Sequence, residues 1–155
     1  MPDPEKPVFR RAVVALNGGP SDARIVRLAA AQAVRSSKEK PELIAVHVVE
    51  IDWTLPLDAD IAGRSEEVQQ VLDTADAIAD SYKLTMEPVL LQARDVGAAI
   101  VDEATERGAD LLIVGLPYRT RFGGDFAIGR TIPYVLQNAP CAVWVVREPM
   151  SEEVS

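Results

Sequence analysis

Glycines and arginines gather in one segment near the C-terminus, in a pattern that suits phosphate binding. The segment joins the apolar stretch ADLLIVG, 109–115, to the apolar stretch PCAVWVVRE, 140–148. Guanidinium groups bind phosphate oxygens in a forked geometry, and glycine lets the backbone approach an anion closely. A helix that begins after such a loop points unpaired N–H groups and its positive dipole end at the ligand. The residues here that could hold an anion are Gly115, Arg119, Arg121, Gly129, Arg130 and Thr131.

The same arginines have a second interpretation, because the chain carries 24 acidic residues against 16 lysines and arginines. They could pair with the protein's own carboxylates in a loop that binds nothing, and such exposed ion pairs contribute little to stability. The residue types alone leave both interpretations open.

The rest of the chain favours a binding protein over an enzyme. His47 is the only histidine and Cys141 the only cysteine, so we expect neither a Ser-His-Asp triad nor a structural metal. Both residues lie in apolar stretches, where packing is the ordinary role. Four acids near residue 60 could be taken for a glycosidase pair, but acids are common in polar loops and at helix starts; they are Asp58, Asp60, Glu66 and Glu67.

The bulk composition excludes several classes of protein. A formal net charge of -8 disfavours nucleic acid and anionic membrane surfaces as partners. No apolar run approaches the roughly 18 residues of a membrane span, and one cysteine cannot form a disulfide within the chain. We expect a cytoplasmic protein. The 155 residues predict one domain over 11–148, with a flexible leader over 1–10 and a flexible tail over 149–155.

Apolar periodicity predicts five strands alternating with four helices. Short β-branched runs bounded by turn residues indicate buried strands, and apolar residues at helical spacing indicate the helices between them. The strands are expected at 11–17, 42–51, 84–93, 109–115 and 140–148, and the helices at 21–36, from 65 onward, at 95–108, and from a start within 129–132.

Alternating strands and helices predict an α/β fold with a single open parallel sheet and helices on both faces. Pro88 lacks a backbone donor, so the third strand should be an edge strand, which agrees with the order 3-2-1-4-5. In that order a ligand belongs over the carboxyl ends of the first and fourth strands. The loops there span 17–21 and 115–131.

The segments VGLP and GRTIPYVLQNAPCAVWVV resemble the universal stress protein family, and the similarity extends from Arg11 to Arg147. In nucleotide-binding members, a first-strand acid contacts the adenosine, a strand-two backbone group contacts the base, and a G-x2-G-x9-G-[ST] loop holds the phosphates. The resemblance places these roles on Asn17, near Val48, and on the loop that begins at Gly115.

This chain departs from that pattern in three places. Asn17 replaces the acid, Tyr118 stands at the second glycine position, and Gly129 comes one residue late, with Arg130 before Thr131. Tyr118 adds a side chain at a position where a phosphate would approach the backbone closely, and Asn17 loses the charge of an acid yet keeps an acceptor for a hydroxyl. We therefore expect a divergent phosphate loop whose arginines compensate.

The last strand should lie at the other edge of the sheet. Its residues Val143, Trp144 and Val145 would leave an apolar edge that can pair with a second copy. The resemblance implies the same homodimer. The alternative is that Trp144 packs beneath a helix.

The favoured function is a stress-response regulatory protein that binds an adenine nucleotide, ATP or AMP, without turnover. One alternative is a dimeric interaction module that binds no nucleotide and engages an unknown protein, or regulates a transporter. A weaker alternative is a slow ATP hydrolase, although no lysine follows the loop glycines as in a Walker A motif.

Overall fold

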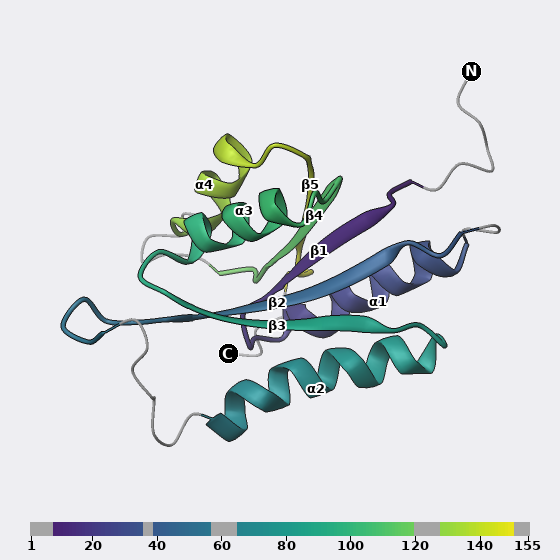
Figure 1. The fold of residues 1–155 in the computed structure, drawn as a ribbon, viewed down its shortest axis with the longest axis horizontal. Helices are drawn as coiled ribbons and strands as arrows, with labels where there is room; N and C mark the ends of the chain where they lie inside the picture. Colours follow the sequence, from purple (N-terminus) through teal and green to yellow (C-terminus); the bar gives the residue numbers. More distant parts are fainter. Residues whose placement is uncertain (1–7, 36–38, 57–64, 120–127, 151–155) are drawn as a thin grey trace.

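The structure is a computed structural model that describes residues 8–35, 39–56, 65–119 and 128–150. Within these residues, strands and helices alternate along the chain (Figure 1). Their bounds are β1 Arg11–Leu16, α1 Ser21–Val34, β2 Glu42–Glu50, α2 Ser65–Ser81, β3 Met86–Ala93, α3 Val96–Glu106, β4 Leu111–Leu116, α4 Thr131–Asn138 and β5 Ala142–Arg147. The element types predicted from the sequence are confirmed, with ends that differ by a few residues.

The five strands form one parallel sheet in the order β3-β2-β1-β4-β5. This confirms the predicted topology. Pro88 lies in the edge strand β3, opposite Ala45 of β2, where its missing donor costs least. The central strand β1 is buried along nearly its whole length, since helices cover both of its faces.

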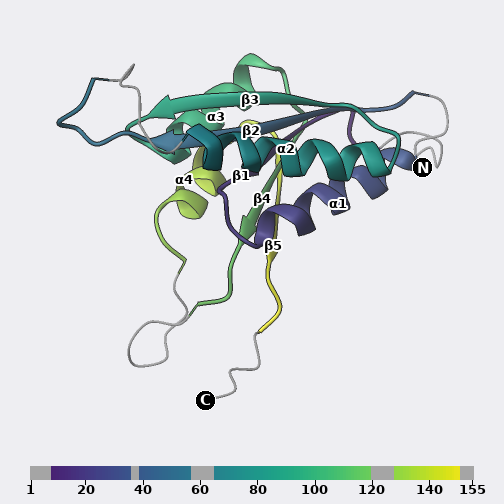
Figure 2. The ribbon, with the colours of Figure 1, turned by 90° about the horizontal axis from the view of Figure 1, so that it is seen from below.

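The helices form one layer on each face of the sheet. Figure 2 shows α1 and α2 side by side along the sheet, and α3 and α4 pack together on the opposite face. Alternate strand residues serve the two layers. Val14 and Ile113 pack toward α1 and α2, and Val13 and Leu112 pack toward α3 and α4.

Local signals set the ends of the helices. Asp95 caps α3 by accepting a hydrogen bond from the Ala98 N–H at 3.1 Å, and Gly108 follows the helix at a φ of 63°. Pro133 falls in the first turn of α4, where a missing N–H is tolerated. The ends of α3 and the start of α4 agree with the helices expected at 95–108 and from a start within 129–132.

The N-terminal side of β1 differs from the predicted leader. Phe9 is only 2% exposed and meets Trp144 edge-on, with ring centroids 6.2 Å apart. The backbone N–H groups of Arg10 and Arg11 donate to the Asp110 carboxylate. Phe9 is therefore packed on the α1 side of the sheet and the Arg10 backbone is held, whereas the Val8 side chain is 70% exposed. The rest of the expected leader, and tail residues 151–155, lie outside the described residues.

Candidate functional site

A cavity of about 490 Å³ lies over the carboxyl ends of β1 and β4, at the predicted switch point. Its walls come from the ends of β1, β2 and β4 and from the start of α4. Seven predicted site residues line it: Asn17, Val48, Gly115, Arg119, Gly129, Arg130 and Thr131. The eighth, Arg121, lies outside the described residues. We call this space the α4 cavity.

Within the described part of the chain, α4 begins beside the α4 cavity without a side-chain cap. Arg130 is the N-cap residue and makes no side-chain hydrogen bond to the helix, in contrast to Asp95 at α3. The first-turn N–H groups of α4 therefore lack the oxygen partner that a cap would give them. Gly129 precedes them at a φ of 73°, a conformation that a side chain disfavours. This end of the helix is suited to an anion.

The arginines add positive charge to the same cavity. Arg119 and Arg130 are both exposed, and none of the ion pairs found among the described residues involves either of them. The acids that do form ion pairs there, such as Glu42 and Glu148, are used by Arg11 and Arg24. Among the described residues, these two arginines therefore form no ion pair with the protein's own acids.

Tyr118 does not fill the α4 cavity. Pro117 and Arg119 on either side of it contribute to the wall, whereas Tyr118 is half-buried with the Arg147 guanidinium 5.0 Å from its ring centroid. The side chain thus packs toward β5. Tyr118 stands where the family pattern has a glycine. Because its side chain points toward Arg147, the α4 cavity stays open.

Gly115 is small for a reason that the sequence did not reveal. A Cβ on Gly115 would lie 2.6 Å from the Ser21 Cβ and 3.5 Å from Ile25, both in α1. The residue thus lines the α4 cavity with its backbone while α1 packs closely against its other side. Close helix packing, and not phosphate approach alone, requires glycine here.

Asn17 ends β1 in a loop that Asp22 holds in place. The Asp22 carboxylate accepts hydrogen bonds from the N–H groups of Asn17 at 3.0 Å and Gly18 at 2.8 Å. Asn17 Oδ1 accepts from the Gly19 N–H at 2.7 Å. Asn17 Oδ1, which we expected to accept from a ligand hydroxyl, therefore already uses one lone pair. The Nδ2 group of Asn17 is the better placed of the two to bind a ligand, as a donor.

The Asp22 carboxyl was not singled out from the sequence, although an acid one turn after Gly18 and Gly19 is the signal that could have revealed it. Burial raises the pKa of Asp22, and the hydrogen bonds from Asn17 and Gly18 and the nearby His47 ring oppose that rise. The carboxyl thus fixes the loop at a cost in desolvation.

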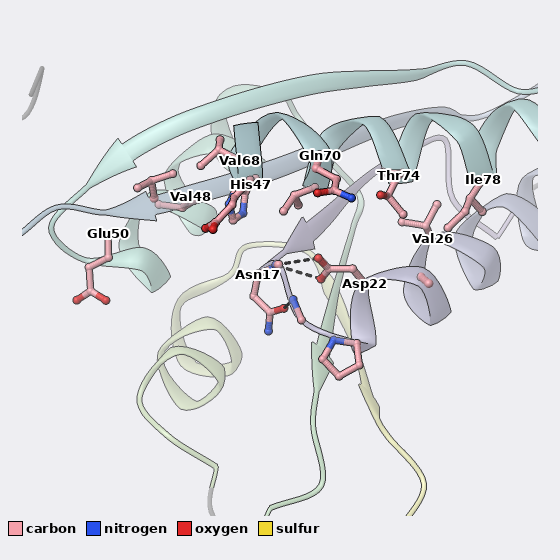
Figure 3. Close-up of a pocket in the computed structure, with 18 residues that line it drawn as sticks. Asn17, Asp22, Val26, His47, Val48, Glu50, Val68, Gln70, Thr74 and Ile78 are labelled. Atoms are coloured by element: carbon pink, nitrogen blue, oxygen red, sulfur yellow. Dashed lines mark hydrogen bonds between the residues drawn. The ribbon is translucent and has the colours of Figure 1, made fainter. Parts of the chain in front are cut away.

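A second cavity, of about 730 Å³, lies between α1 and α2 on the other face of the sheet. Figure 3 shows Asp22 and His47 near Asn17 at one end of it, with Thr74 and Ile78 of α2 farther along. His47 is buried, as expected, and its Nδ1 lies 3.0 Å from the Leu16 carbonyl oxygen. The sequence analysis did not predict this space, which we call the α1–α2 cavity.

Fold and cavity together define a class: a doubly wound parallel α/β domain with an anion-suited site at its switch point. Residues 9–147 match the family model described as the universal stress protein family. The chain belongs to the universal stress protein family.

A curated protein is similar in sequence to nearly the whole of this chain. The chain is 32% identical over 145 residues to the sensor protein KdpD of Mycobacterium tuberculosis, and two strains give the same match. That similarity covers 94% of this chain but only 15% of the relative's length.

Solved structures share the fold. A universal stress protein from Archaeoglobus fulgidus has a TM-score of 0.70 at 24% identity, over 90% of this chain and 99% of that one. The structure of the Archaeoglobus fulgidus protein in complex with dAMP has a TM-score of 0.66 at 23% identity, with 90% and 98% covered. A universal stress protein in complex with cAMP gives 0.66 at 21%, with 91% and 98% covered.

No described helix combines the length and apolar character that crossing a bilayer requires.

Proposed function

We propose that this chain binds an adenine mononucleotide in the α4 cavity and acts as a regulatory protein in the cytoplasm. The observation that carries the proposal is the meeting of uncapped α4 donors with two arginines that have no ion pair among the described residues, at the carboxyl ends of β1 and β4. Phosphate fits such a cluster of donors and positive charge. Relatives of the same fold that were solved with dAMP or cAMP support the same class of ligand.

Each end of the cavity has a distinct task. The N–H groups after Gly129, with Arg119 and Arg130, would hold the phosphate, and the Thr131 hydroxyl would add a donor. The Val48 backbone and Asn17, at the ends of β2 and β1, would contact the base and the ribose. Among the described lining residues there is no histidine and a single carboxylate, Glu50, and we propose binding without turnover.

Thermal melting with ATP, AMP and cAMP tests the proposal. A ligand at about a hundred times its Kd stabilises the folded state by roughly 2.7 kcal/mol. We expect a rise in Tm with at least one of these nucleotides, a smaller rise in Arg130→Ala, and an unchanged rise in Arg27→Ala, a matched change on the exposed face of α1. No rise with any nucleotide would leave the non-binding interaction module as the better description.

We also propose a homodimer through β5. This edge strand has no neighbour on one side in the described sheet, and Val145 is 37% exposed. Trp144 packs against Phe9 and Val143 against the core on the α3–α4 side, so the exposed Val145 would carry most of the contact. Light scattering should show that Val145→Glu yields monomers. The control Leu90→Glu, on the opposite edge strand β3, should leave the dimer intact. A monomeric parent protein would contradict the proposal.

A further inference from the structure

The α1–α2 cavity has a polar end and an apolar body. Asn17, Asp22 and His47 form the polar end, at the edge of the sheet. Farther along, α1 and α2 line the space with the aliphatic side chains of Val26, Ala75 and Ile78 and with the polar side chain of Thr74 (Figure 3). Val68 and Val71 add apolar surface nearer the polar end, beside His47 and Gly18. A compound that fills this space therefore needs one polar head and an apolar remainder.

The polar end offers acceptors with spare capacity. Each Asp22 oxygen takes one backbone N–H and keeps further lone pairs. The His47 Nδ1 faces the Leu16 carbonyl oxygen, which can only accept, so Nδ1 carries a hydrogen, and in the neutral ring Nε2 is then an acceptor. His47 is 8% exposed, and Nε2 has no hydrogen-bond partner among the described residues. Such an acceptor in the wall of the cavity can take a hydrogen bond from a donor group of a ligand.

The charge of the lining selects the sign of that ligand. Asp22, Glu50 and Glu67 line the cavity, and neither lysine nor arginine is among its described lining residues. A phosphate would meet carboxylates here, whereas a cation would meet complementary charge. A metal ion fits less well, because the described residues contain no group of three or more His, Cys, Asp or Glu side chains arranged to hold one.

We propose that the α1–α2 cavity is a second ligand site, and that its ligand is a small organic amine. The ammonium group donates to the Asp22 carboxylate and to His47 Nε2, and the apolar body lies between Val26 of α1 and the aliphatic face of α2. Glu50 and Glu67 at the rim attract the cation. This site is separate from the phosphate end of the α4 cavity, although both cavities share Asn17, Val48 and Glu50.

Matched probes test the charge requirement. Hexylamine, phenethylamine and tryptamine are titrated into the full chain, each beside an alcohol and a carboxylate of the same shape, with binding followed by calorimetry and by amide NMR shifts. We expect at least one amine to bind, its alcohol to bind at least tenfold more weakly, and its carboxylate not to bind. The shifts should centre on α1 and α2. Equal binding of amine and alcohol, or no binding by any amine, overturns the proposal.

Variants test the location. Asp22→Asn should weaken the amine at least tenfold, and Asp76→Asn, the same change on an exposed α2 residue outside the cavity, should leave it unchanged. Because Asp22 also holds the β1–α1 loop, Thr74→Leu provides an independent test: it fills the cavity without removing any of the hydrogen bonds described above. Thr74→Leu should abolish amine binding and retain nucleotide binding. Undiminished amine binding in Thr74→Leu contradicts the assignment.

Discussion

The two cavities lie at the same edge of one sheet and differ in charge. Both touch Asn17 and Val48, at the ends of β1 and β2. The α4 cavity adds Arg119, Arg130 and an uncapped helix start, whereas the α1–α2 cavity adds Asp22, Glu67 and a buried histidine. The strand order places ligands at this edge, and the helices that flank it decide which chemistry each side offers.

Reversing charge in the α4 cavity should have the largest effect on nucleotide binding. Each charge-assisted hydrogen bond contributes about 1.5 kcal/mol or more, so losing both arginines costs roughly 3 kcal/mol, about a hundredfold in Kd. We expect calorimetry to show this loss in Arg119→Glu/Arg130→Glu and unchanged amine binding. Arg27→Glu/Arg35→Glu alters the net charge equally at exposed α1 positions, and an equal loss there would mean that overall charge, not the cavity, governs binding.

Gly115→Ala asks which side of β4 requires the glycine. The new Cβ would collide with Ser21, and such overpacking costs typically about 1–3 kcal/mol. We expect the free energy of unfolding in urea to fall by that amount, and Ser21→Gly in the same chain to recover part of it. Unchanged stability combined with lost nucleotide binding would instead assign Gly115 to phosphate contact alone.

Gly129→Ala separates backbone conformation from crowding at the start of α4. No atom of the described residues lies within 4 Å of the Cβ position, but the φ of 73° disfavours any side chain. Chemical denaturation should show a loss of about 1 kcal/mol, smaller than that of Gly115→Ala. A larger loss than in Gly115→Ala would reverse our explanation of the two glycines.

The pH dependence of Asp22 should give the smallest effect. Burial raises its pKa above the ordinary 3.8, so folding favours the protonated carboxyl. Its contribution to the free energy of unfolding is fully present below pH 3.8 and is lost as pH rises through the folded-state pKa. A carboxyl NMR titration should place this pKa above 3.8, and Asp22→Asn should remove the slope. A titration midpoint below 3.8 would contradict the desolvated environment.

Sequence patterns predicted the fold because strong local signals agreed with one another. Pro88 marked an edge strand, and apolar periodicity marked the helices expected at 95–108 and from a start within 129–132. The residues of the α4 cavity followed from the strand order and the family resemblance. Side-chain direction did not follow, because the packing of Tyr118 under Arg147 depends on a contact with β5.

The α1–α2 cavity escaped prediction for a related reason. Asp22 and His47 are 25 residues apart in the chain, and each has an ordinary local role, in a helix turn and in a strand. Only the packing of α1 beside α2 brings them to one space. Likewise, Gly115 in β4 contacts Ser21 in α1, 94 residues away in the chain. The spacing of residues along the sequence could not predict that contact.

The most direct test of the account is an amide NMR titration of the full chain with AMP. Nucleotide binding in the α4 cavity predicts that the largest shifts fall at Gly115 and at residues 128–132, with smaller shifts near Asn17 and Val48. Largest shifts at Val71 and Thr74, in the acidic α1–α2 cavity, or no shifts with AMP at all, would contradict it.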